Sequence, residues 1–430
     1  MKLPSFISNN LILKITSLNS LVVGTRLIIS LIVQNLLAHY TGQSGIAKVG
    51  QIRNLSNILM SVSSLGVFNG VVKYVSEYKN NQAGLLKLFS TVFVFSTIAT
   101  CLLSVFMFLY ANNLSHWLFF TQDYSLVFKL LAVVVPFIAM NRIFNGVING
   151  ISAYKINAKI EVIWYTFASI LMIVSLYFYN IRGVLLAIAV TPVIQFITIL
   201  YLFGKTLKEY IKFKNLSFRT PLLNALLGFA LMSFVGTVFL NFIEIELRTL
   251  ISDHISENEA GVWTAMSSIS KIYMQFLIII FPIYILPNYA KINSFEAFVK
   301  QLKKIYSSLL PLVVTGMILV YLFKNQIIQI IYTNEFMSMA VLFKWQLMAD
   351  FTKFLAVVLA YYFLSKNAFI YFISTELLSL IAYYFFAKTL ILSYGTQGVV
   401  IANFIRYFCY LLMVIIAVFY YFRTVQNRVS

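Results

Sequence analysis

Apolar runs of about 20 residues recur along this chain of 430 residues, from Leu11 to Phe422. A helix of that length crosses the ~30 Å hydrocarbon core of a bilayer, and it satisfies its backbone hydrogen bonds internally. Hydrophobic residues make up 61% of the chain and charged residues 10%, whereas a soluble domain has about 45–50% and about 25%. No water-soluble fold could bury this much apolar surface. We therefore expect an all-α integral membrane protein.

The apolar runs and the breaks between them predict about twelve transmembrane helices. The first run has no cleavage pattern behind a short apolar core, so we expect it to stay as a membrane anchor. The predicted spans lie near residues 11–38, 45–68, 88–111, 126–150, 157–179, 183–203, 222–247, 260–287, 305–323, 336–364, 368–392 and 397–422.

The net charge of +19 is distributed unevenly over the connections. If the N-terminus is cytoplasmic, the cytoplasmic connections and the two termini carry most of the lysines and arginines outside the spans. The opposite connections carry only Arg182, Arg248, Lys324 and Lys388. This asymmetry follows the positive-inside rule and predicts that both termini are cytoplasmic. A nucleic-acid partner, which such a charge suggests for a soluble protein, is therefore not expected.

The most basic connection, residues 204–221, divides the predicted helices equally, six from six. Both halves then enter the membrane in the same direction, as in a parallel repeat. We predict two six-helix lobes, residues 1–210 and 211–430. Gly146 and Gly150, each preceded by an asparagine, are expected to loosen the fourth helix and to permit rocking between the lobes.

Several basic residues lie inside the predicted spans. An ionised group at the bilayer centre costs about 2.5–3.5 kcal/mol on insertion scales, so such groups normally face a polar interior. Lys14, Lys48 and Lys129 lie near helix ends and can extend to the headgroups. For the deeper residues two interpretations stay open, a polar cavity or an ion pair between helices. These residues are Arg26, Arg53, Arg142, Lys271, Lys353 and Arg406.

Acidic residues at comparable depth are few, and they include Asp350 and Glu376. Asp350 and Lys353 share a helix face, so a local ion pair and a functional role are both open. Glu244 and Arg248 are four residues apart near the expected outer surface, where a local pair is favoured. Since the interior has more cations than acids, and arginine binds phosphate through two parallel hydrogen bonds, the predicted cargo is an anion.

The sequence lacks the motifs of common enzyme sites. It has no HExxH motif, no Cys/His ligand spacing, no P-loop and no dinucleotide-binding motif. Its two cysteines, Cys101 and Cys409, lie in apolar runs. We expect a transporter without a metal or cofactor. A polysaccharide polymerase or ligase is a less favoured alternative, because the predicted outer connections are all short.

Five segments spread over both halves form a recognisable set. One contains Phe-Asn-Gly-Val-x-Lys-Tyr from Phe68, and another contains Gly-x-Trp-x-x-x-Ser-Ser-Ile-Ser from Gly261. The set resembles the Wzx-type flippases for lipid-linked oligosaccharides, most closely the O-antigen translocase and enterobacterial-common-antigen lipid III flippase branch. Their superfamily also contains multidrug exporters. The segments are Gln51–Leu55, Val67–Tyr78, Ala260–Phe276, Tyr284–Pro287 and Phe343–Asp350.

The resemblance implies a V-shaped bundle of two lobes, as in the MATE exporters. It implies movement of an undecaprenyl-pyrophosphate-linked oligosaccharide, an O-antigen unit or lipid III, from the cytoplasmic to the periplasmic leaflet of the bacterial inner membrane by alternating access. Coupling to an H⁺ or Na⁺ gradient is an open expectation. The expected partners are this glycolipid, membrane lipid, and the polymerase and chain-length machinery of lipopolysaccharide biosynthesis.

The alternative is a multidrug or cation antiporter of the same superfamily. Such a protein would favour carboxylates inside the N-terminal half. The acids of that half, Glu77, Asp123, Glu161 and Glu209, all lie at or beyond the predicted helix ends. We therefore prefer the flippase.

Two groups of site residues are predicted. The resemblance carries over family positions at Arg53, Lys73, Arg248, Asp350, Lys353 and Glu376. Lys271 departs from the family pattern, which has an acid there, and Arg26 and Arg142 are assigned from their depth alone. The predicted substrate-binding residues are Arg26, Arg53, Arg142, Lys271, Lys73 and Arg248. The predicted gating or coupling residues are Asp350, Lys353 and Glu376.

Overall fold

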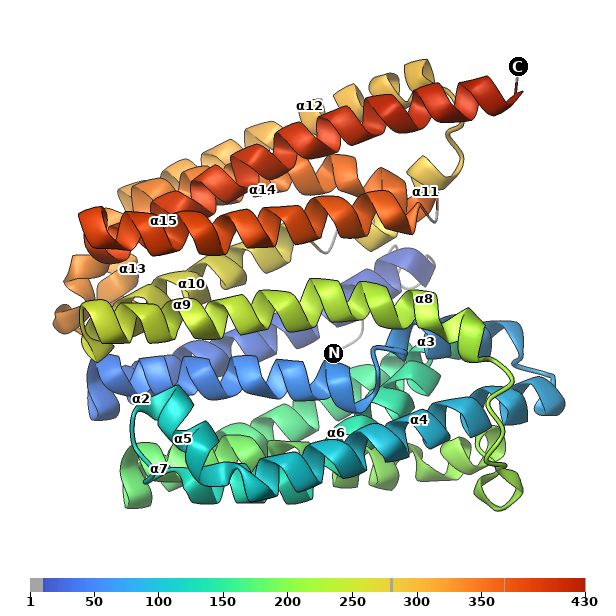
Figure 1. Cartoon of the computed structure of the whole chain (residues 1–430), viewed down its shortest axis with the longest axis horizontal. Helices are drawn as coiled ribbons and strands as arrows, with labels where there is room; N and C mark the ends of the chain where they lie inside the picture. Colours follow the sequence, from blue (N-terminus) through green and yellow to red (C-terminus); the bar gives the residue numbers. More distant parts are fainter. Residues whose placement is uncertain (1–10, 279–280, 367, 430) are drawn as a thin grey trace. The chain divides into compact units, whose positions relative to one another are not determined.

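A computed structural model describes residues 11–278, 281–366 and 368–429 of the chain. Within these ranges the chain is helical almost throughout and contains no strand (Figure 1). Eight of the described helices are long and apolar enough to cross a membrane. The protein is therefore an all-helical, multi-pass membrane protein, as the apolar runs predict.

Three of the long helices are each two helices joined at one residue with non-helical backbone angles. The joints are Gly42, Asn180 and Gly395, with φ between 51° and 62°. Glycine adopts this conformation readily, and asparagine tolerates it better than most residues. The side-chain oxygen of Asn180 also accepts a hydrogen bond from the next backbone nitrogen, at 2.7 Å. The three helices are α2 (Leu11–Ser63), α7 (Tyr154–Tyr210) and α15 (Phe369–Val429).

The described residues form two compact units. Unit 1 contains the described residues up to Thr41 together with Gln51–Asn241, and unit 2 contains Gly42–Gly50 and the described residues from Phe242 onward. The predicted lobes, 1–210 and 211–430, rest on helix order and remain a prediction. Unit 1 contains most of α2 and the helices α3 (Phe68–Glu77), α4 (Gln82–Leu109), α5 (Ala111–Phe119), α6 (Ser125–Gly150), α7 and α8 (Leu223–Ser233). It also contains the short segments η1 (Phe213–Asn215) and η2 (Phe234–Phe239).

In unit 1, α6 packs against α3, α4 and α7. A Cβ atom added at Gly146 would lie 2.8 Å from Val71 Cγ1, and one added at Gly150 would lie 2.8 Å from Val75 Cβ. These glycines therefore let α3 approach α6 closely, as small residues do between membrane helices. The prediction that they loosen the helix is wrong, because α6 is continuous from Ser125 to Gly150.

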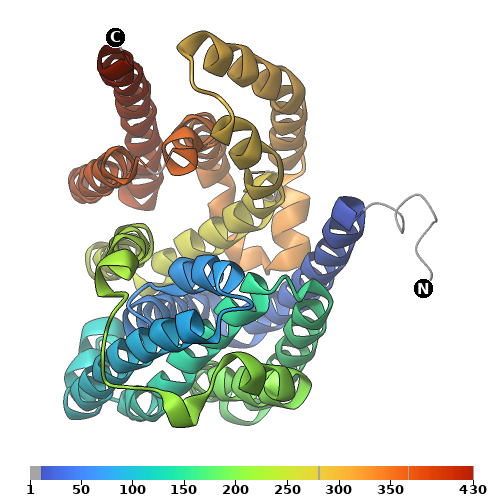
Figure 2. The ribbon, with the colours of Figure 1, turned by 90° about the vertical axis from the view of Figure 1, so that its right-hand side faces the viewer.

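In unit 2, α14 packs against α15, whose C-terminal arm runs obliquely in the view of Figure 2. Their core is rich in aromatic rings, including Tyr362, Tyr410 and Phe422. The predicted span 260–287 is divided into a long helix, a π-helical segment and a short helix. The remaining elements of unit 2 are α9 (Leu240–His254), which starts at the boundary between the units, α10 (Glu257–Ile278), η3 (Phe281–Ile285), α11 (Leu286–Ala290), α12 (Phe295–Leu322), α13 (Lys324–Ile331), η4 (Asn334–Val341) and α14 (Leu342–Ser365).

Candidate functional site

Unit 1 contains a polar cavity of about 570 Å³ between α2, α3, α6 and α7. The lining positions on α6 and on the first arm of α7 recur every three or four residues, which places them on one face of each helix. The two helices therefore turn polar faces toward the same space. The α6 positions are Ile138, Asn141, Arg142, Asn145 and Asn149; those of the first α7 arm are Asn157, Glu161, Trp164, Tyr165, Ala168, Ser169 and Met172.

Three of the predicted substrate-binding arginines line this cavity. Arg26 and Arg53 come from α2, and Arg142 comes from α6. Glu161 is the one acidic residue among the described lining residues. Three guanidinium groups and one carboxylate give the cavity wall a net charge of +2.

Arg26 is held by other side chains. Its Nη1 lies 2.8 Å from Glu161 Oε2, and its guanidinium lies 4.9 Å from the ring centre of Tyr165 and 5.7 Å from that of Trp164. The ion pair and the cation–π contacts fix its orientation. Glu161 lies two turns inside α7, so its expected position at a helix end is wrong.

Arg53 and Arg142 have more freedom. Neither forms an ion pair with a residue that the structure describes. The guanidinium of Arg142 lies 4.0 Å from the ring centre of Phe68, so one face of its plane is covered while its edge can still donate hydrogen bonds. These two arginines are therefore the cations of the cavity that are open to a ligand.

The opposite face of α7 borders an apolar groove of about 610 Å³ in unit 1. Ile163, Phe167 and Ile170 line it from the first arm, and Ile197 and Tyr201 line it from the second. All five side chains are exposed in the structure, as expected of residues that contact lipid. One helix thus separates a polar cavity from an apolar surface.

Lys73 lies outside the set of residues that line the cavity. It is on α3, its side chain is half exposed, and its ammonium lies 3.8 Å from Glu77 and 5.2 Å from the ring centre of Tyr74. This exposed pair of neighbours on one helix contributes little to stability.

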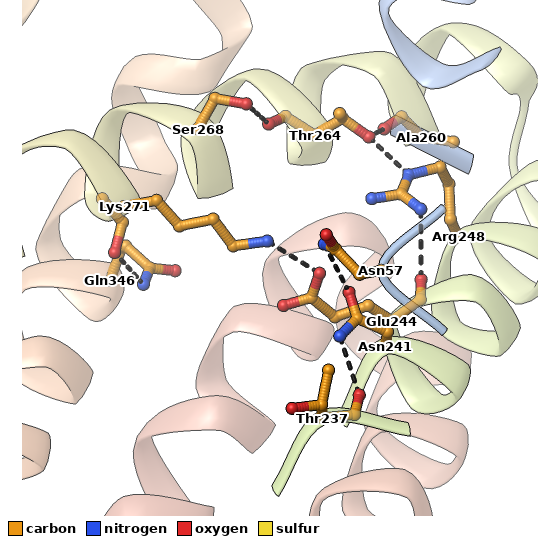
Figure 3. A network of polar contacts seen from close by, with 11 residues as sticks. Asn57, Thr237, Asn241, Glu244, Arg248, Ala260, Thr264, Ser268, Lys271 and Gln346 are labelled. Carbon is orange, nitrogen blue, oxygen red and sulfur yellow. Dashed lines mark hydrogen bonds and ion pairs between the residues drawn. The ribbon is translucent and has the colours of Figure 1, made fainter. Parts of the chain in front are cut away.

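The other predicted site residues lie in unit 2. Arg248, on α9, is only 2% exposed, so it is buried inside the protein. Its Nε donates a hydrogen bond to Thr264 Oγ1 at 2.7 Å (Figure 3). Its guanidinium also lies 5.2 Å from the ring centre of Trp263. A Cβ atom on Gly50 would lie 2.9 Å from Arg248 Nε. Arg248 is therefore closely enclosed by neighbouring helices.

Lys271 pairs with an acid of the neighbouring helix. Its Nζ lies 2.8 Å from Glu244 Oε2, and the lysine side chain is 60% exposed whereas that of Glu244 is 13% exposed (Figure 3). Glu244 was predicted to pair with Arg248. Its carboxylate contacts Lys271, and its backbone oxygen accepts a hydrogen bond from Arg248 Nη1 at 3.4 Å.

Asp350 is 1% exposed on α14. Its Oδ2 accepts hydrogen bonds from Ser270 at 2.6 Å, from Gln346 at 3.1 Å and from Tyr273. Lys353, one turn further along α14, lies over the ring of Tyr407 with its Nζ 5.4 Å from the ring centre. Asp350 is therefore surrounded by neutral hydrogen-bond donors.

Arg406 and Glu376, on the two arms of α15, form an ion pair in which the arginine is buried and the glutamate is partly buried. Arg406 Nη2 lies 3.2 Å from Glu376 Oε1, and Arg406 is 2% exposed. Its guanidinium also lies 4.6 Å from the ring centre of Tyr407. Of the two interpretations left open for the deep basic residues, a polar cavity or an ion pair between helices, the ion pair is confirmed for Arg406.

The sequence alone did not identify every residue that lines the cavity. The residues it missed include Glu161 and the five carboxamide residues Asn141, Asn145, Asn149, Asn157 and Gln195. The spacing of Asn141, Asn145 and Asn149, each four residues from the next, is the sequence signal that could have indicated a polar face on α6.

The comparisons with known proteins agree with the motif resemblance. Residues 49–341 match the model of a family described as polysaccharide biosynthesis protein. The chain is 28% identical over 380 residues to the lipid III flippases of Escherichia coli (strain K12) and Shigella flexneri, covering 88% of this chain and 91% of each relative. These matches confirm the resemblance to flippases.

Solved structures with a similar fold include a multidrug resistance MATE family transporter of the MOP superfamily in an inward-facing conformation. The TM-score is 0.74 at 14% identity, and the alignment covers 94% of this chain and 95% of that one. The chain therefore has the MATE fold. These relatives are flippases and transporters, not enzymes.

Proposed function

Because the chain belongs to the polysaccharide biosynthesis protein family, we propose that it is a flippase for an undecaprenyl-pyrophosphate-linked oligosaccharide in a bacterial cytoplasmic membrane. In this proposal about twelve helices cross the membrane with both termini in the cytoplasm, and two six-helix lobes alternate their access to the two leaflets. O-antigen units and lipid III are the candidate cargoes, and the similarity to lipid III flippases supports this class.

The observation that supports the proposal most is the charge of the cavity in unit 1. Its lining carries Arg26, Arg53 and Arg142 against the single described acid Glu161, a net charge of +2. The diphosphate of a lipid-linked saccharide carries two negative charges, and guanidinium groups bind phosphate oxygens through paired hydrogen bonds. A cationic drug would be repelled by the same wall, which disfavours the antiporter alternative.

We also propose gating or coupling roles for Asp350, Lys353 and Glu376, and the surroundings of these residues support the roles to different degrees. Asp350 is a carboxylate inside a membrane span, where ionisable groups commonly bind or release a coupling ion. Glu376 is engaged by Arg406 at 3.2 Å, so it is better suited to holding the two arms of α15 together than to ion binding.

Purified protein in proteoliposomes that contain a fluorescent undecaprenyl-diphosphate-linked saccharide tests the proposal. Arg53→Gln and Arg142→Gln are each expected to reduce flipping by about tenfold or more, since a hydrogen bond to a charged group contributes about 1.5–3 kcal/mol. Lys129→Gln, on the exposed surface of α6 and outside the cavity, is the matched control and should retain the wild-type rate.

The same variants can be expressed in a flippase-null strain, where the readout is assembly of surface polysaccharide. Normal assembly with a protein that carries both Arg53→Gln and Arg142→Gln would contradict the proposed role of the cavity.

A further inference from the structure

We propose that the asparagine face of α6, formed by Asn141, Asn145 and Asn149, is a saccharide subsite that adjoins a diphosphate subsite at Arg53 and Arg142. This inference rests on the proposed function, because it assigns the parts of one lipid-linked substrate to different walls of the same cavity. It also excludes Arg26 from direct binding to the diphosphate, because Arg26 is paired with Glu161.

The asparagine face makes one hydrogen bond to another helix, through Asn141, which leaves most of its polar atoms unexplained by packing. Asparagine is a weak helix former, and a membrane helix normally keeps polar groups few. Here three asparagines follow one another at intervals of four residues on the face of α6 that lines the cavity. Asn141 Nδ2 donates to the backbone oxygen of Pro192 at 2.7 Å, and Asn149 Nδ2 donates to that of Asn145 at 2.7 Å.

Polar atoms of this wall are left without partners. Asn141 Oδ1, Asn145 Oδ1 and Trp164 Nε1 are buried and form no hydrogen bond with the described part of the protein. Buried polar groups in folded proteins are nearly always paired. The terminal torsion of an asparagine side chain has broad minima, so these amides can turn toward a molecule that fills the cavity.

Carboxamides and guanidinium groups suit different parts of the substrate. A carboxamide both donates and accepts hydrogen bonds, and so do the hydroxyl and acetamido groups of a sugar. A guanidinium only donates, which suits phosphate oxygens that only accept. The asparagine face therefore matches the chemistry of a neutral saccharide and not that of a diphosphate.

The position of Arg142 among the asparagines agrees with the direct bond between sugar and diphosphate in the substrate. Arg142 lies next to Asn141 and three residues before Asn145, so it shares their face of the helix. In a lipid-linked saccharide the first sugar is bonded directly to the diphosphate. Arg26 is excluded from the diphosphate subsite because its charge is balanced by Glu161 at 2.8 Å.

Equilibrium binding to two lipids tests the assignment. The probes are undecaprenyl diphosphate and the same lipid carrying one N-acetylglucosamine, each titrated into purified protein in nanodiscs. We expect wild type to bind the sugar-bearing lipid more tightly. Asn145→Leu, which keeps the shape but removes the amide, should weaken binding of that lipid by about five- to tenfold and change the affinity for undecaprenyl diphosphate by less than about twofold.

Two further variants separate binding from folding. Arg142→Gln should weaken binding of both lipids to the same degree, and Asn112→Leu, at an exposed position on α5, should change neither. Because Asn145→Leu removes an unpaired buried oxygen, its melting temperature should equal or exceed that of wild type.

The possible failures are distinguishable. Equal affinity of wild type for the two lipids, or equal weakening of both by Asn145→Leu, would overturn the saccharide subsite and leave the diphosphate subsite in place. Binding of neither lipid by wild type would overturn the proposed function as well.

Discussion

Two arginines of unit 1, Arg53 and Arg142, differ from Arg406 of unit 2 in their distance from an acid. In unit 2, Arg406 is 2% exposed and is paired with Glu376, so its charge is balanced within the protein. In unit 1, Arg53 and Arg142 line a cavity and have no ion pair among the described residues. The position of the nearest carboxylate therefore separates Arg406 from Arg53 and Arg142, and we expect it to separate structural charges from binding charges.

Removal of the balancing acid in unit 2 should have the largest effect. Glu376→Gln leaves Arg406 buried without its carboxylate, and loss of one partner of a buried ion pair costs about 3–5 kcal/mol. We expect a large decrease in melting temperature in detergent, measured by intrinsic fluorescence. Replacing both residues, as Glu376→Met with Arg406→Met, should restore much of the stability. If Glu376→Gln alone were as stable as wild type, the charge of Arg406 would not need Glu376, and the difference from Arg53 and Arg142 would disappear.

Asp350→Asn should separate stability from ion coupling. Ser270, Tyr273 and Gln346 all donate to the same oxygen of Asp350, and an amide oxygen is a weaker acceptor than a carboxylate oxygen, so stability should fall by about 1 kcal/mol. If Asp350 couples transport to an ion, flipping in proteoliposomes should no longer respond to an imposed proton or sodium gradient. An unchanged response would assign Asp350 a purely structural role.

Glu161→Gln tests the acid of unit 1. The substitution changes the cavity charge from +2 to +3 and releases Arg26 from its ion pair. The pair is partly exposed, so its loss should change stability by less than about 1 kcal/mol. Affinity for undecaprenyl diphosphate should rise by about two- to fivefold, measured by the same nanodisc titration. Weaker binding would show that Glu161 orients Arg26 toward the ligand.

Lys271→Gln should have the smallest effect. The lysine side chain is 60% exposed, and exposed ion pairs contribute about 0.2–1 kcal/mol. We expect a change in melting temperature close to the error of the measurement and flipping within about twofold of wild type. A large loss of flipping with normal stability would instead support the predicted role of Lys271 in substrate binding.

The helical architecture was largely predictable because each span has its own apolar run. The breaks at Asn180 and Gly395 were expected as loops, yet each is a single residue with positive φ between two helices. Hydropathy detects the loss of apolar character at such a position but not how sharply the chain turns there. Gly146 and Gly150 were misinterpreted for a similar reason, because their purpose depends on Val71 and Val75 of another helix.

The candidate cavity was predictable only in part. The depth of Arg26, Arg53 and Arg142 in their spans indicated a polar interior, and all three line one cavity. The pairing of Arg26 with Glu161 joins residues that are 135 positions apart, so it depends on the tertiary fold and leaves no local pattern in the sequence. The roles of these residues in binding remain predictions that the experiments above address.

The two-sided character of α7 limits how this helix can move during a transport cycle. Rolling the first arm about its own axis by half a turn would bring Glu161 and Asn157 to the lipid and Phe167 and Ile170 into the water of the cavity. A charged group in the bilayer costs about 2.5–3.5 kcal/mol on insertion scales, and the exposed apolar side chains would add to this. Tilting and sliding preserve both faces. The sequence of α7 therefore opposes rotation of the helix about its own axis. The helix can tilt or slide as a rigid body during transport, but it cannot rotate without a large cost in free energy.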